Sequence, residues 1–171
     1  MKKCALLLSF AMIFSFNAFS LAASCCDPPD LKAVEKEKPK RCAHVPAHGG
    51  TFNVVGSCET GHGEAKVDGS TLKLWFTGSC CELKKPVPLS YKEIAFKGEI
   101  PGAKEPRELV LKAKPLLLAG EKEGASSYFE GSADWLATTK NFIASAKLKF
   151  RGSDVDFKIV WPDGNDKGDD D

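Results

Sequence analysis

The alternation of apolar and polar residues constrains the fold of this chain more than any other feature. From Phe142 to Phe150 every second residue is apolar, and three of the four residues between them are serine or lysine. The same period of two runs from Val155 to Trp161. In an extended strand, successive side chains point to opposite faces, so this pattern gives each strand one apolar and one polar face. The alternation therefore predicts β-strands and disfavours long helices.

Shorter runs with the same character are spread over the preceding hundred residues. They lie at 51–55, 63–67, 71–76, 91–97, 108–114 and 127–131. Turn-forming pairs separate them, among them Asp68-Gly69 and Arg151-Gly152. Close spacing across these turns predicts two hairpins, formed by 63–67 with 71–76 and by 142–150 with 154–161.

Short strands at this spacing predict an all-β fold. We expect an antiparallel, immunoglobulin-like β-sandwich of about seven to eight strands, and a partly open barrel is the alternative. One short helical turn is expected near Asp134–Leu136, after the possible cap residue Ser132.

The chain divides into four segments. Residues 1–23 have a basic start, an apolar middle and small residues at the end, which is the pattern of a secretory signal peptide. Residues 24–41 form a polar tether with three prolines, 42–162 the β-sandwich domain, and 163–171 an acidic disordered tail. Without the signal, roughly 150 residues remain, which suits a single domain.

The composition also limits the expected location of the protein and the classes of partner that it can bind. We expect it to be exported to the periplasm or cell envelope, with a lipid anchor on Cys25 as an alternative to ordinary signal cleavage. The 24 basic and 23 acidic residues are nearly balanced, which argues against nucleic acid as a partner. No later apolar run is long enough for a transmembrane span.

Six cysteines lie outside the signal segment, and an even number in an exported chain favours disulfides. They are Cys25, Cys26, Cys42, Cys58, Cys80 and Cys81. The sequence leaves their connectivity open. We favour Cys42 with Cys58 as a disulfide beside the histidines over either cysteine as a metal ligand, because an oxidising compartment competes for thiols.

All three histidines lie between positions 44 and 62. His62 and Glu64 are two apart on a predicted strand and so share a face, which we expect to be the solvent-exposed one. His48 precedes the strand 51–55, and Gly49-Gly50 allows a tight turn or a close backbone approach. Imidazole and carboxylate groups suit zinc, copper and nickel. These positions predict a metal site of His48, His62 and Glu64, with His44 joining through a loop as a fourth ligand.

Motifs for catalysis are missing. The chain contains no Gly-x-Ser-x-Gly elbow, no His-Glu-x-x-His helix and no phosphate-binding glycine loop. Each cysteine of the mature chain has a plausible disulfide partner, which disfavours a thiolate nucleophile. We therefore expect a non-enzymatic protein.

Short motifs between about 44 and 160 resemble a family of exported bacterial proteins, mostly uncharacterised. They are His48-Gly49-Gly50-Thr51-Phe52, His62-Gly63-Glu64, Leu72-Lys73-Leu74-Trp75-Phe76, Lys85-Pro86-Val87-Pro88 and Ser127-Tyr128-Phe129-Glu130-Gly131. Similar His-Gly-Gly domains stand at the N-terminus of periplasmic adaptor subunits of heavy-metal efflux pumps. The resemblance implies a β-sandwich and metal association through His48, His62 and Glu64. The chain differs from the family in its added cysteines and lacks the helical hairpin and lipoyl-like region of a full adaptor.

Two functions follow as expectations. The first is an exported, non-enzymatic protein that binds a divalent transition metal for buffering or handling in the cell envelope. The second is a disulfide-stapled interaction or structural module without metal, whose partner is an envelope or efflux-system protein.

Overall fold

The computed structural model describes residues 44–167. The predicted signal peptide and tether lie outside the described residues, as do Cys25, Cys26, Cys42 and the last four positions of the tail. No helix between residues 44 and 167 is long and apolar enough to cross a bilayer.

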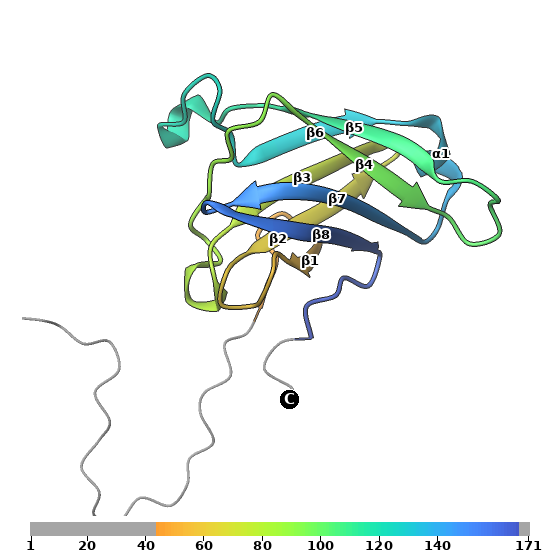
Figure 1. Cartoon of the computed structure of the whole chain (residues 1–171), viewed down its shortest axis with the longest axis horizontal. Coiled ribbons are helices and arrows are strands. Elements are labelled where there is room, and N and C mark those ends of the chain that lie inside the picture. Colours follow the sequence, from red (N-terminus) through yellow and green to blue (C-terminus); the bar gives the residue numbers. More distant parts are fainter. Residues whose placement is uncertain (1–43, 168–171) are drawn as a thin grey trace, which may run out of the picture. The chain divides into compact units, whose positions relative to one another are not determined.

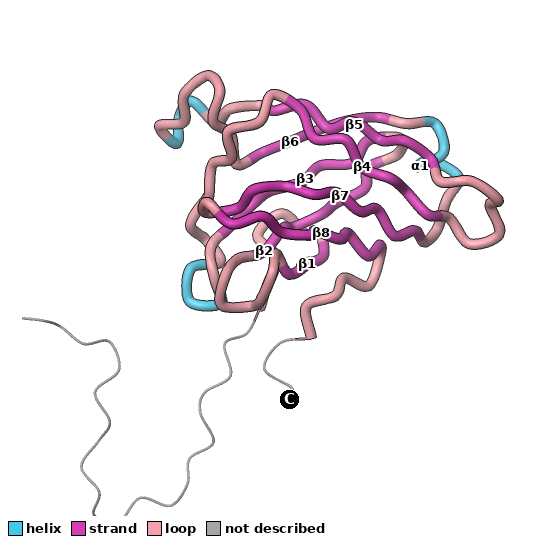
Figure 2. Tube along the Cα trace, viewed as in Figure 1, coloured by secondary structure: helices cyan, strands magenta, loops and turns pink. Residues whose placement is uncertain are grey.

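Strands make up almost all of the regular structure (Figure 2). They are β1 (Thr51–Val54), β2 (His62–Asp68), β3 (Thr71–Thr77), β4 (Glu93–Glu99), β5 (Arg107–Ala113), β6 (Tyr128–Ser132), β7 (Phe142–Phe150) and β8 (Ser153–Trp161). The short helix α1 covers Asp134–Thr138, and two 3-10 turns, η1 (Cys80–Glu82) and η2 (Leu117–Ala119), lie in loops. The predicted all-β fold with seven to eight strands and a helical turn after residue 133 is confirmed. Ser132 does not cap that turn, because its Oγ pairs with Thr71 Oγ1 instead.

All eight strands belong to one antiparallel sheet, in the order β1-β2-β3-β6-β5-β4-β7-β8 (Figure 1). Both predicted hairpins are present, as β2–β3 and β7–β8. The sheet curls almost into a barrel, so the two faces of the expected sandwich are parts of one continuous sheet. This architecture is the one expected of the partly open barrel, which the sequence analysis gave as the alternative to a sandwich.

Asparagine side chains bridge the two edge strands, β1 and β8. The buried Asn53 Oδ1 accepts a hydrogen bond from Val160 N at 2.8 Å, and Val54 N donates to Asn165 Oδ1 at 2.7 Å. Asn165 N also donates to the Phe52 carbonyl at 3.2 Å. A buried backbone N–H without a partner is costly, so these amides take the place of a regular strand ladder. They bring the segment after β8 against β1 (Figure 1), and the ring of His44 lies 6.4 Å from that of Phe52 on the same strand.

The inside of the curled sheet is filled mainly by phenylalanine and leucine. Phe76 lies at its centre, with ring centroids 5.4 to 6.1 Å from those of Phe129, Phe150 and Phe157. Each buried aromatic side chain contributes about 1.5–3 kcal/mol relative to an exposed one. On β7 the buried positions are those that the alternation predicts, from Phe142 to Phe150. The core therefore packs against the inner face of β2, the strand that carries two of the predicted site residues.

Candidate metal centre

His62 begins β2 and is completely buried. Its Nδ1 lies 3.2 Å from the carbonyl oxygen of Gly78, which can only accept a hydrogen bond. We therefore place the hydrogen on Nδ1, and in the neutral ring Nε2 then carries a lone pair. Desolvation by burial is the main cause that lowers the pKa of His62, and the neutral form is favoured as a result. A carbonyl that orients a histidine through its second nitrogen is a common feature of metal ligands.

His44 and Asp166 cover this histidine from two distant parts of the chain. His44 Nδ1 lies 2.5 Å from Asp166 Oδ2, and His62 Nε2 lies 3.5 Å from the same oxygen. The rings of the two histidines are 5.3 Å apart and steeply tilted, with Phe52 against both. The side chains of His44 and Asp166 are only 7% and 4% exposed, so the group is shielded from water.

Two buried histidine nitrogens in this group are available as ligand atoms. His62 Nε2 and Asp166 Oδ2 face each other at 3.5 Å, and in the tautomer assigned above neither carries a hydrogen. Among residues 44–167, His62 Nε2 and His44 Nε2 are buried nitrogens with no hydrogen-bond partner. Buried polar atoms without partners are uncommon and need an explanation. The cluster therefore offers two unpartnered imidazole nitrogens beside a carboxylate, which is a possible set of metal ligands.

Cys58 supplies the fourth potential donor. One ligand atom from each of His44, Cys58, His62 and Asp166 lies within 4.8 Å of the others. The Cys58 sulfur is bonded to Cys80, which lies on η1. The prediction that Cys58 forms a disulfide with Cys42 is therefore wrong, because its partner is Cys80. Cys80 reaches it because η1 lies beside the loop before β2, as shown by the hydrogen bond from Cys80 N to the Cys58 carbonyl.

Glu64 has a different environment from the one that the strand pattern predicts. Its side chain is 1% exposed, and His62 is 0% exposed, so the prediction that they share a solvent-exposed face is wrong, although they do share a face. The segment 44–50 folds over this face and covers it. Glu64 accepts backbone hydrogen bonds from Ala47, His48 and Gly50 at 2.7 to 3.0 Å. This carboxylate therefore holds the segment that carries His44.

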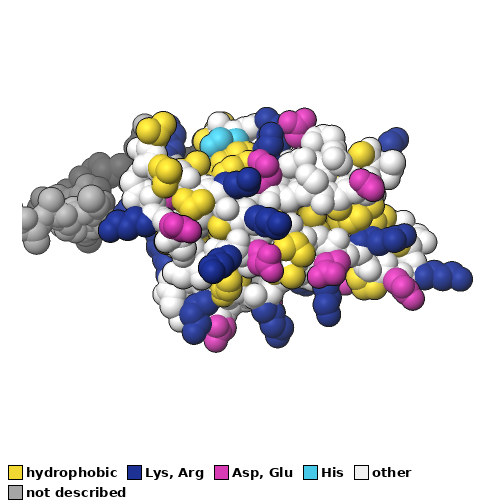
Figure 3. Space-filling view, turned by 90° about the horizontal axis from the view of Figure 1, so that it is seen from above, with side chains coloured by type: hydrophobic (Ala, Val, Ile, Leu, Met, Phe, Trp, Pro, Cys, Tyr) yellow, Lys and Arg dark blue, Asp and Glu magenta, His cyan; other side chains and the backbone are white. Residues whose placement is uncertain are grey.

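His48 lies beside Glu64 and outside the group of four. Its Nδ1 is 2.9 Å from Glu64 Oε2, and its ring stacks on Trp75 with centroids 4.0 Å apart. Its side chain is 42% exposed, and Figure 3 shows histidine surface beside apolar side chains on one face of the molecule. The two neighbouring glycines behave as predicted. Gly49 adopts φ +72°, and a Cβ on Gly50 would lie 2.3 Å from the Ala65 carbonyl oxygen.

Of the predicted ligands, the structure thus brings His44 and His62 together and leaves His48 and Glu64 as a neighbouring pair. Asp166 was not among the predicted ligands, because it lies in the segment 163–171 that the sequence predicts to be an acidic disordered tail. No local signal distinguishes Asp166 from the other aspartates there. The backbone hydrogen bonds of Asn165 and Asp166 to the Phe52 carbonyl, with that of Val54 N to Asn165 Oδ1, direct its carboxylate toward the histidines.

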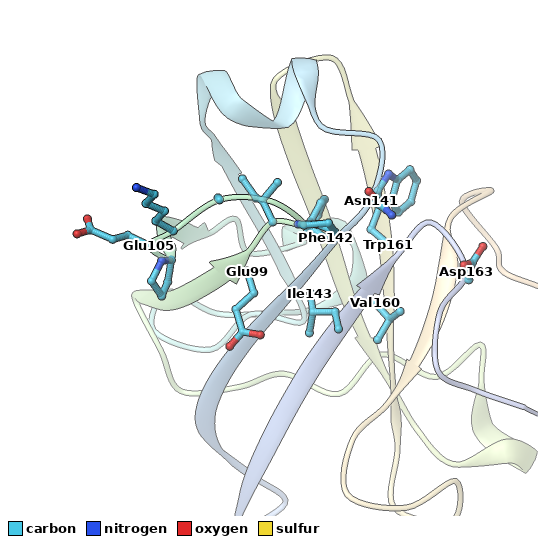
Figure 4. A pocket seen from close by; sticks show the side chains of 13 residues that line it. Glu99, Glu105, Asn141, Phe142, Ile143, Val160, Trp161 and Asp163 are labelled. Carbon is cyan, nitrogen blue, oxygen red and sulfur yellow. The ribbon is translucent and has the colours of Figure 1, made fainter.

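A groove of about 600 Å³ lies at another part of the sheet, where β4, β7 and β8 meet (Figure 4). Its walls include Glu99, Ile143 and Trp161, and the carboxylates of Glu99 and Asp163 lie far apart in the view. None of its lining residues is a histidine or a cysteine. The groove therefore offers no convergent set of reactive groups comparable to the histidine cluster.

Comparisons of the chain with protein-family models, curated proteins and solved structures find no match.

Proposed function

We propose that this protein is a non-enzymatic binder of a divalent transition metal, with His44, His62 and Asp166 as its ligands. The observation that carries the proposal is the convergence of these donors, together with Cys58, within 4.8 Å of one another. The three come from the segment before β1, the start of β2 and the segment after β8, and their side chains are almost fully buried.

The donor set favours particular metals. Two imidazoles and one carboxylate suit zinc, copper and nickel, whereas calcium and magnesium prefer sites made of oxygen. The Gly78 carbonyl holds His62 in the tautomer whose Nε2 is a ligand. A three-ligand set leaves one coordination position that the protein does not fill, unlike the four protein ligands of a structural zinc site, which supports buffering or handling of the metal.

We further propose that the protein works in the periplasm or cell envelope. The signal-like pattern of residues 1–23 supports export, and the Cys58–Cys80 disulfide supports an oxidising compartment. Lipid attachment at Cys25 stays an alternative within this proposal.

A second candidate is an interaction module without metal, stapled by the disulfide. Exposed apolar side chains favour it: Leu117 is 72% and Leu118 108% exposed on η2, and Val45 is 72% exposed. Its partner would be an envelope or efflux-system protein that covers these side chains.

Calorimetric titration of the oxidised protein with zinc, copper(II) and nickel separates the two candidates. We expect wild type to bind at least one of these ions, and Asp166→Asn and His44→Ala to bind it at least tenfold more weakly. Asp156→Asn is the matched control, because it makes the same change at an exposed carboxylate on β8 outside the cluster, and its affinity should equal that of wild type.

Equal binding by wild type, Asp166→Asn and His44→Ala would refute this ligand set. Loss of binding in His48→Ala with full binding in Asp166→Asn would instead support the ligands that the sequence analysis predicted. If wild type binds none of the three ions, the interaction module is the better proposal.

A further inference from the structure

Cys58 belongs to two arrangements at once, a disulfide with Cys80 and the four-donor cluster. We propose that reduction of this disulfide changes the metal site, by adding the Cys58 thiolate to His44, His62 and Asp166. The inference rests on the proposed function, since it concerns the same site. It assigns to Cys58 the role of a ligand whose availability depends on the thiol–disulfide state.

The loop that carries Cys58 is held by more than the disulfide. Its loop is held by its own hydrogen bonds: Val55 N donates to the Gly61 carbonyl at 2.8 Å, and Thr60 N donates to that of Ser57 at 2.9 Å. Ser57 Oγ and Thr60 Oγ1 are also 2.8 Å apart. Because these bonds lie on both sides of Cys58, breaking its bond to Cys80 leaves the backbone in place and the sulfur near the histidines.

The segment that carries Cys80 is anchored independently as well. Gly78 N donates to the Lys85 carbonyl at 3.0 Å, and Arg151 pairs with Glu82 at 2.9 Å. The Cys80 sulfur lies 3.2 Å from the Cys58 carbonyl oxygen, which offers an acceptor to the hydrogen of a reduced thiol. Both halves of the disulfide can therefore exist as thiols without rearrangement of the surrounding chain.

The chemistry of sulfur explains why the two states differ. Metals bind the thiolate, and a disulfide sulfur has no negative charge to offer. With the disulfide intact, the site has two nitrogens and one oxygen and an open position. A dithiol reductant delivers two electrons and two protons, the S–S bond breaks, and the reductant becomes a disulfide. The metal then displaces the proton of the Cys58 thiol to solvent and gains a fourth ligand.

Binding and reduction are coupled in both directions. If reduction increases the affinity for zinc, zinc must favour the reduced state by the same factor. Thiolate is also a softer ligand than carboxylate, so reduction shifts the preference of the site toward zinc. The site would thus hold zinc more firmly in reducing surroundings and release it on oxidation.

Cobalt(II), a coloured substitute for zinc, tests the inference in the full chain. Cys80→Ser keeps the Cys58 thiol, and the matched Cys58→Ser/Cys80→Ser variant lacks it, while all other cysteines are common to both. Each is treated with a phosphine, which becomes the phosphine oxide with oxygen from water as it opens any disulfide among the other cysteines, and is desalted under nitrogen. We expect a thiolate-to-cobalt charge-transfer band in Cys80→Ser only, and cobalt binding at least tenfold weaker in the double variant.

A redox titration of wild type needs no substitution. In glutathione buffers, zinc should raise the reduced fraction of the Cys58–Cys80 pair at a given ratio of thiol to disulfide, as measured by thiol alkylation and mass spectrometry. Equal cobalt affinity in the two variants, no charge-transfer band and no effect of zinc on the redox titration would overturn the role of Cys58. If the role of Cys58 is overturned but cobalt still binds to wild type and not to Asp166→Asn, the proposed function stands. If none of the proteins binds cobalt, both the proposed function and the role of Cys58 are overturned.

Discussion

Replacing Glu64 with glutamine tests whether this carboxylate holds the segment that carries His44. Oε1 accepts hydrogen bonds from His48 N and Gly50 N, and Oε2 accepts them from Ala47 N and His48 Nδ1. Glutamine has the same shape but one acceptor oxygen, so two of these four donors would face an amide NH₂ group. The substitution thus removes two hydrogen bonds and the charge from a buried position.

The size of the effect follows from these contacts. A hydrogen bond to a charged group contributes about 1.5–3 kcal/mol, and the lower value applies here because water reaches the partly exposed His48. We expect Glu64→Gln to lower the free energy of unfolding of the metal-free protein by about 3 kcal/mol, and the melting temperature by about 10 °C. Urea denaturation and thermal unfolding followed by circular dichroism measure the two quantities.

Glu93→Gln is the matched control, because Glu93 is an exposed carboxylate on β4, and surface changes of this kind stay within about 0.5 kcal/mol. The reasoning fails if Glu64→Gln is as stable as this control. A variant of normal stability that no longer binds metal would show that Glu64 is a ligand, as the sequence analysis expected.

Two further predictions concern His62 and Asn53. Because burial lowers the pKa of His62 below its ordinary 6.5, the unfolded chain takes up a proton that the folded one resists. The free energy of unfolding of the metal-free protein should therefore decrease as the pH falls through about 6.5, by up to about 1.4 kcal/mol per pH unit. The decrease should be smaller in His62→Gln. If urea denaturation gives both proteins the same dependence of the unfolding free energy on pH, the prediction is wrong. Asn53→Leu should lower the free energy of unfolding by about 1–3 kcal/mol, because Val160 N loses its acceptor. The control Asn141→Leu, at an exposed position, should leave the free energy of unfolding nearly unchanged. Equal stability of the two variants would show that the bridge between β1 and β8 is dispensable.

The sequence by itself determined the strands and their near neighbours. The alternation from Phe142 to Phe150 is a local property, because the period of two decides which side chains can be buried together. The turns at Gly69 and Gly152 then join adjacent strands into hairpins. The same local reasoning located the histidines near β1 and β2 and the need for glycine at positions 49 and 50.

Only the tertiary structure decided which groups meet. His44 and Asp166 are 122 residues apart, and the curling of the sheet with its asparagine bridges between β1 and β8 brings them together. The partner of Cys58 depends on where η1 lies, and the burial of Glu64 on how the segment 44–50 folds back over β2. Such contacts depend on the closure of the whole sheet, which leaves no periodic signal in the chain. The composition of the candidate metal centre is for this reason a property of the fold.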